Sequence, residues 1–115
     1  MTLISSDLAE LQEAAGEPAA AEEFEYVAGL FKALGDRNRQ KILYLLREGE
    51  MSVSDLLPHF DILQPTVSTH LLLLEEAGVL RVRREGRRRL YRVADPGIYE
   101  ALDGFVGEFT GLLRR

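Results

Sequence analysis

The chain has 115 residues, of which 46% are hydrophobic, 29% are charged and none is cysteine, and its formal net charge at pH 7 is −5. This length and composition predict a single domain with a modest core, and the lack of cysteine excludes disulfides, thiolate metal ligands and thiol redox switching. The sequence shows neither a secretory signal nor an apolar run of the roughly 18 to 20 residues that span a membrane, so we expect a cytoplasmic protein without a membrane partner.

The first 18 residues are predicted to form an acidic N-terminal extension. Apolar residues at positions 4, 8 and 11 have helical spacing, and a helix-breaking segment follows at residues 16–18. A short helix and a disordered acidic arm fit this composition equally well. We therefore divide the chain into this extension, residues 1–18, and a folded domain, residues 19–115.

Three helices are predicted in the first half of the domain. The first covers about residues 20–34, and Asp36 is placed to cap the second. Ser52 and Asp55 have the spacing of a capping box, which predicts that a third helix begins after Ser52. Pro58 should shorten or bend this third helix, because proline has no backbone amide hydrogen to donate.

The fourth helix, predicted from residue 64 or 65 to residue 77, has two kinds of surface. Its apolar stripe consists of Val67, Leu71 and Leu74. A helix that reads DNA needs such a stripe as an anchor, while its first turns reach base edges in the major groove. The candidate DNA contacts in these turns are Gln64, Thr66, Ser68, Thr69 and His70. Helix capping or backbone hydrogen bonds would also explain Thr66 and Ser68, and packing against the following hairpin would explain His70.

A β-hairpin is predicted next, with Leu80 and Val82 on one side, Tyr91 and Val93 on the other and Gly86 in the turn. The final helix is predicted over about residues 96–113. This order of four helices, hairpin and helix is that of a winged helix-turn-helix, a mainly α fold with one hairpin.

Charge is segregated along the chain. Residues 1–30 hold seven acidic side chains and no basic one, whereas residues 81–92 hold seven arginines and one glutamate. Planar guanidinium groups match phosphate oxygens, so we expect phosphate contacts from Arg83, Arg84, Arg87, Arg88 and Arg89. The competing interpretation is a solvated hairpin whose arginines pair with Glu75, Glu76 and the acidic N-terminus.

The segment from residue 31 to residue 93 resembles the ArsR family of bacterial dimeric repressors, also called the SmtB family. The resemblance is carried by residues 30–39, 42–43, 64–71 (QPTVSTHL), 74, 77–80, 84–87 and 91. It implies a homodimer formed by the first and last helices, two recognition helices in successive major grooves of an operator, and repression of a nearby promoter. The implied interface residues are Phe24, Val27, Phe31, Leu102, Phe105 and Phe109. Residues 19–115 would then be the DNA-binding and dimerisation domain.

Several positions depart from the family pattern. Metal-sensing members often carry E-L-C-V-C-D-L where residues 50–56 stand here, with Ser52 and Ser54 at both thiolate positions. Serine is a poor ligand for soft metals, whether these serines are natural or replace cysteines. The family's second metal site, in the last helix, is also incomplete, because Gly97 and Gly111 stand where imidazoles are expected. We therefore predict no metal and no cofactor.

Two further departures affect the fourth helix. Leu63 stands where the family usually has a serine cap, and Leu72 stands where a basic residue commonly approaches phosphate.

An alternative function is a winged-helix protein-interaction module without an operator, in which the acidic N-terminus and the leucine-rich fourth helix bind a partner protein. No enzymatic activity is expected, since the sequence lacks a glycine-rich phosphate loop and a nucleophile with a base. The inducer, the operator sequence and the regulated genes cannot be read from these patterns.

Overall fold

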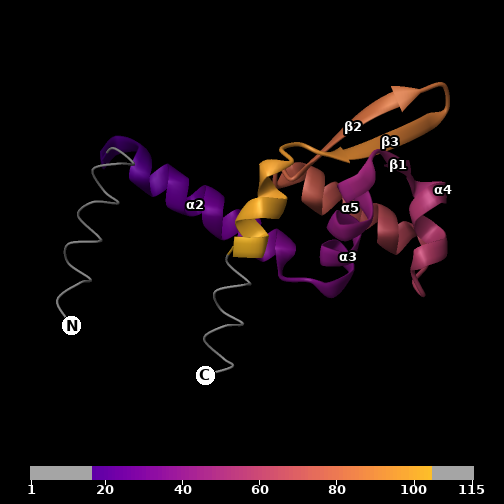
Figure 1. The fold of residues 1–115 in the computed structure, drawn as a ribbon, viewed down its shortest axis with the longest axis horizontal. Helices are drawn as coiled ribbons and strands as arrows, with labels where there is room; N and C mark the ends of the chain where they lie inside the picture. Colours follow the sequence, from indigo (N-terminus) through magenta and orange to yellow (C-terminus); the bar gives the residue numbers. More distant parts are fainter. Residues whose placement is uncertain (1–16, 105–115) are drawn as a thin grey trace. The chain divides into compact units, whose positions relative to one another are not determined.

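The computed structural model describes residues 17–104, with side chains from residue 21. Two units make up the chain, residues 1–32 and residues 33–115. The described part of the first unit belongs to helix α2 (Glu17–Leu34) (Figure 1). This helix begins three residues before its predicted start, because Pro18 is tolerated in a first turn, where amides have no intrahelical acceptor. Within residues 17–104 no helix combines the length and the apolar composition that crossing a membrane requires.

The second unit has the predicted order of helices, hairpin and helix. Its elements are α3 (Arg37–Leu45), η1 (Leu46–Glu48), β1 (Met51–Ser52), α4 (Val53–Leu56), η2 (Leu57–His59), α5 (Gln64–Glu76), β2 (Leu80–Glu85) and β3 (Arg88–Val93). Residues 97–104 are again helical. The rest of the predicted final helix, with Phe105 and Phe109, lies outside the described residues, as does the extension before residue 17.

Both predicted helix caps are present. The Asp36 carboxylate accepts hydrogen bonds from the backbone amides of Asn38, at 2.8 Å, and Arg39, at 3.1 Å. Ser52 and Asp55 form the reciprocal capping box, in which each side chain accepts from the other residue's backbone amide, at 3.1 and 3.0 Å. As predicted, the proline ends the third helix early. α4 makes a single turn and continues as the 3-10 helix η2, which contains Pro58.

The sheet has one strand more than the sequence pattern indicates. β2 and β3 form the predicted antiparallel hairpin, in which Leu80 faces Val93 and Val82 faces Tyr91. Gly86 supplies the turn at a φ of 63°, a left-handed conformation that glycine adopts without strain. β1 adds to the free edge of β3, giving the order β1-β3-β2. A strand of two residues is too short to show an alternating pattern, which is why β1 escaped prediction.

The core of the second unit forms between α3, α4, α5 and the base of the hairpin. Its fully buried side chains are Ile42, Leu56, Val67, Leu71, Leu74 and Leu80. Burial of each such side chain contributes about 1.5–3 kcal/mol. The predicted apolar stripe of α5 is therefore confirmed, and it fixes which face of this helix remains at the surface. The Tyr99 hydroxyl donates to the Leu43 carbonyl oxygen at 2.7 Å and so ties residues 97–104 to α3.

The N-terminal cap of α3 can be tested by replacing Asp36 with alanine. The variant loses the acceptor for two amides, and we expect a loss of about 1 kcal/mol in the free energy of unfolding at pH 7. The Arg39 amide lowers the pKa of Asp36 below its ordinary value of 3.8. This stabilisation is therefore fully present above pH 3.8 and is lost as the pH falls through the folded-state pKa. Thermal denaturation followed by circular dichroism should show the two proteins converging in acid.

Asp36→Asn is the matched control, because asparagine keeps an oxygen acceptor and is an equally good N-cap. It should retain most of the stability that Asp36→Ala loses at pH 7. Equal losses in the two variants would show that the carboxylate acts through its charge and not as a cap.

Candidate nucleic-acid interface

Helix α5 begins with polar side chains at the surface. Gln64, Thr66, Ser68 and Thr69 are all exposed, whereas the buried side chains of this helix are Val67, Leu71 and Leu74. No side chain caps the first turn, as the leucine at position 63 led us to expect, and Leu63 is 77% exposed. The Thr69 hydroxyl donates to the Pro65 carbonyl oxygen at 3.0 Å, so this threonine offers its methyl group and a lone pair to an outside partner.

His70 differs from the other candidate contacts of α5. Its side chain is only 12% exposed. Nδ1 lies 3.2 Å from Nη1 of Arg39 and 3.9 Å from Oδ1 of Asp36. Among the described residues, the imidazole therefore contacts the start of α3, and these contacts link α5 to the cap of α3.

Two hairpin arginines have carboxylate partners. Arg83 makes a two-pronged contact with Glu50, from Nε to Oε2 at 2.8 Å and from Nη2 to Oε1 at 2.9 Å, and also reaches Glu85 at 3.1 Å. Hydrogen bonding to Arg83 lowers the pKa of Glu50, so this carboxylate remains charged at neutral pH. The pair links the hairpin to the residue that precedes β1.

The second paired arginine is Arg88. Its Nη2 lies 3.0 Å from Oδ2 of Asp55 and 3.3 Å from Oγ of Ser52. Hydrogen bonds from Ser52 lower the pKa of Asp55. The capping box of α4 therefore also holds β3. The sequence pattern did not predict that Glu50 and Asp55 bind hairpin arginines, because only the register of β1 on β3 brings these carboxylates to the hairpin.

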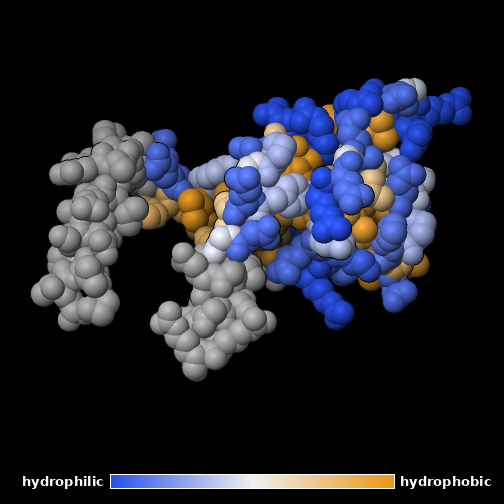
Figure 2. Space-filling view, viewed as in Figure 1, coloured by the Kyte–Doolittle hydropathy of each residue, from blue (hydrophilic) through white to orange (hydrophobic). Residues whose placement is uncertain are grey.

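The other three predicted phosphate contacts are Arg84, Arg87 and Arg89, and all three are exposed. None of them forms an ion pair within residues 21–104. Arg84 and Arg89 are directly opposite each other on β2 and β3. In the view of Figure 2, hydrophilic side chains cover much of the hairpin, with some hydrophobic ones between them. The structure thus divides the five predicted arginines into two that are neutralised by carboxylates and three that are not.

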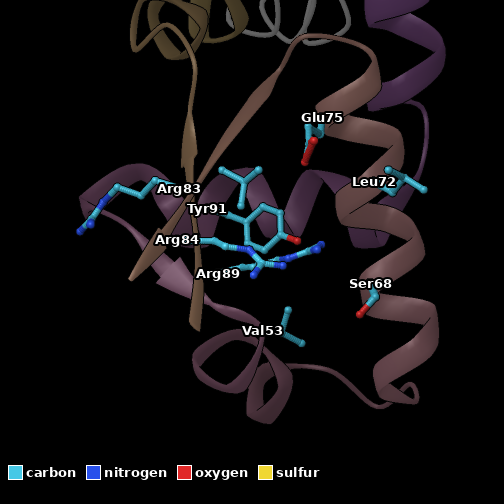
Figure 3. Close-up of a pocket in the computed structure, with 9 residues that line it drawn as sticks. Val53, Ser68, Leu72, Glu75, Arg83, Arg84, Arg89 and Tyr91 are labelled. Atoms are coloured by element: carbon cyan, nitrogen blue, oxygen red, sulfur yellow. The ribbon is translucent and has the colours of Figure 1, made fainter. Parts of the chain in front are cut away.

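A groove of about 500 Å³ separates α5 from the hairpin. α5 contributes Ser68, Leu72 and Glu75, and the hairpin contributes Arg84, Arg89 and Tyr91 (Figure 3). Leu72, at the position where the family often has a basic residue, is 52% exposed at this groove. Ser68 of α5 and two of the three unpaired arginines, Arg84 and Arg89, thus line one groove, together with the paired Arg83.

Ser52, at one of the two thiolate positions of the family's first metal site, belongs to the capping box of α4. Within the described part of the chain, no three His, Cys, Asp or Glu side chains are grouped as metal ligands. Ser52 Oγ instead accepts hydrogen bonds from the backbone amide of Asp55 and from Nη2 of Arg88. Gly111, at one of the expected imidazole positions of the family's second site, lies outside the described residues.

Comparisons with known proteins agree with this arrangement. Residues 36–82 match the family model described as bacterial regulatory protein, arsR family. A helix-turn-helix transcriptional regulator of Methanocaldococcus jannaschii is 39% identical over 82 residues, which cover 70% of this chain and 92% of that protein. The transcriptional repressor SdpR of Bacillus subtilis is 43% identical over 58 residues, which cover 50% of this chain and 64% of that protein.

A solved structure gives the same result for the fold. It is the solution structure of the homodimeric winged helix-turn-helix DNA-binding domain of a possible ArsR-family regulator from Mycobacterium bovis. The TM-score is 0.67 and the identity is 33%, with 76% of this chain and 83% of that chain covered. This chain therefore belongs to the ArsR family of bacterial regulatory proteins and has the winged helix-turn-helix fold of its relatives.

Proposed function

We propose that this protein is a homodimeric repressor that binds an operator through α5 in the major groove and through the hairpin on the phosphate backbone. The observation that supports this proposal is the groove between α5 and the hairpin, where the exposed Ser68 of α5 lies across from Arg84 and Arg89, which form no ion pair within residues 21–104. Base edges and phosphates lie side by side on a DNA duplex, and these two kinds of group match them.

The proposed base contacts are Gln64, Thr66 and Thr69, since these side chains are exposed in the first turns of α5. Ser68, which lines the groove beside the hairpin, is proposed as a further DNA contact. The proposed phosphate contacts are Arg84, Arg87 and Arg89. Arg83 and Arg88 are assigned to fixing the hairpin, because their guanidinium groups already bind Glu50 and Asp55. We assign His70 the role of holding α5 against α3.

A homodimer is supported by the apolar surface of α2. Phe24, Val27 and Phe31 lie at helical spacing and are 67%, 43% and 53% exposed. An exposed apolar stripe of this kind marks a surface that a partner covers. We propose that residues 19–115 dimerise through this stripe together with Leu102 and with Phe105 and Phe109 of the final helix. The homodimeric state of the M. bovis relative supports the same conclusion.

Enzymatic activity and a thiolate metal site are not part of the proposed function. We propose a cytoplasmic regulator without enzymatic activity and without a thiolate metal site, because Ser52 is committed to the capping box at the position of that site. The alternative of a protein-interaction module gives no role to the three arginines whose charge is not neutralised within residues 21–104. Binding of DNA gives them one.

The phosphate contacts can be tested through the salt dependence of binding. The DNA is a duplex selected from a random-sequence library, and its Kd is measured by fluorescence anisotropy at several salt concentrations. Replacing Arg84, Arg87 and Arg89 by glutamine should weaken binding and flatten the slope of log K against log salt by about 0.9 per lost contact. Arg83→Gln, which removes a neutralised arginine, is the control and should leave the slope nearly unchanged, whereas loss of a phosphate contact would flatten it by about 0.9. An unchanged slope in the triple variant would contradict the assignment.

The base contacts can be tested through the difference between specific and non-specific binding. We expect Gln64→Ala and Thr69→Ala each to weaken binding to the selected duplex by about 5- to 150-fold. Binding to a random duplex of the same length should be nearly unchanged, because it depends on phosphates. Glu76→Gln, at the far end of α5, is the control and should keep the preference for the selected sequence. Equal losses on both duplexes would assign Gln64 and Thr69 to the backbone instead.

A further inference from the structure

The opposed arginines of the hairpin are the starting point. Arg84 and Arg89 face each other across β2 and β3. Side chains alternate between the two faces of a strand, so both arginines share the face that carries Val82 and Tyr91. This face lines the groove beside α5. Two guanidinium groups thus lie next to each other above an apolar floor.

Such a pair is unfavourable in the free protein. Like charges directly opposite each other destabilise an antiparallel pair of strands. Arg83 and Arg88 are opposite Leu90 and Glu85 and bind Glu50 and Asp55. Arg84 and Arg89, in contrast, have no ion-pair partner within residues 21–104. A local arrangement that costs stability is expected where it serves a function.

The groove supplies further donors at the same place. Ser68 of α5 and Tyr91 of β3 both line it, and their hydroxyl groups are on the side of the two arginines (Figure 3). Glu75 is the one acidic side chain among the lining residues. It lies seven residues beyond Ser68, about 10 Å along the helix at 1.5 Å per residue. An anion is therefore favoured at the Ser68 end of the groove and disfavoured at the Glu75 end.

We propose that Arg84 and Arg89, with the hydroxyl groups of Ser68 and Tyr91, form a binding site for one phosphodiester group of the DNA backbone. This inference rests on the proposed function and extends it. The two non-bridging oxygens of a phosphodiester can each accept from one guanidinium group, and Val82 and the Tyr91 ring fit the apolar edge of a sugar. A single phosphate would then be held by the recognition helix and the hairpin together, which fixes the position of α5 along the major groove.

The test uses thymidylyl-thymidine, which has a single phosphodiester, as the probe. It is titrated into the full chain, and NMR follows the Ser68 and Tyr91 amides and the arginine Nε groups. We expect saturable shifts at Ser68, Arg84 and Arg89 in the wild type. In the double variant Arg84→Gln/Arg89→Gln the affinity should fall at least tenfold.

A matched control is provided by the second cross-strand arginine pair. Arg81 and Arg92 also face each other on β2 and β3, but their side chains lie on the other face of the hairpin. Arg81→Gln/Arg92→Gln removes the same charge and should bind the dinucleotide as the wild type does. Equal losses in the two double variants would overturn the site, because they would show attraction by net charge alone.

Thermal melting provides an independent readout. Because it relieves the repulsion, Arg84→Gln/Arg89→Gln should melt at a temperature equal to or above that of the wild type in chloride buffer. A lower melting temperature would overturn the electrostatic basis of the site.

Inorganic phosphate is titrated in parallel with the dinucleotide. Binding of phosphate without binding of the dinucleotide would overturn the assignment to DNA by showing that the site takes a free anion.

The selected duplex separates this inference from the proposed function. If the wild type binds the duplex but the dinucleotide shifts none of these groups, the phosphodiester site is wrong and the proposed function stands. If the wild type does not bind any selected duplex, the proposed function itself fails.

Discussion

The proposed DNA-binding surface depends on two ion pairs, each between a carboxylate and an arginine of the hairpin. Glu50 and Asp55 lie on either side of β1, and each binds one arginine of the hairpin. The hairpin is thereby attached to the unit at two points, so its unpaired arginines have a defined place. Exposed ion pairs contribute little to stability, commonly 0–1 kcal/mol. These ion pairs matter here because the guanidinium groups that they bind are not available to a phosphate, whereas the unpaired ones are.

The second constraint is the apolar face of α5. Val67, Leu71 and Leu74 are completely buried, so the helix cannot rotate without exposing them to water. The polar side chains of its first turns are consequently held at the surface, and Ser68 is held at the groove beside the hairpin. A flexible loop would lose conformational entropy on binding DNA, whereas this helix and this hairpin present their groups already in place.

Much of this arrangement could be predicted from the sequence, because it depends on local patterns. The caps at Asp36 and Ser52 involve residues two or three positions apart, and the stripe of α5 follows helical spacing. Other features depend on contacts between distant segments and have no local pattern. Arg83 and Glu50 are 33 positions apart, and they meet only because the two-residue strand β1 pairs with β3. His70 turns toward Arg39, 31 positions away, which the composition of α5 alone does not indicate.

A crystal structure of the dimer on a selected duplex tests the central claim most directly. We predict that the first turns of α5 lie in the major groove and that Arg84 and Arg89 bind one phosphate. Arg83 and Arg88 should keep their ion pairs with Glu50 and Asp55. A complex in which Arg83 and Arg88 leave their carboxylates for the DNA, with Arg84 and Arg89 in solvent, would contradict it.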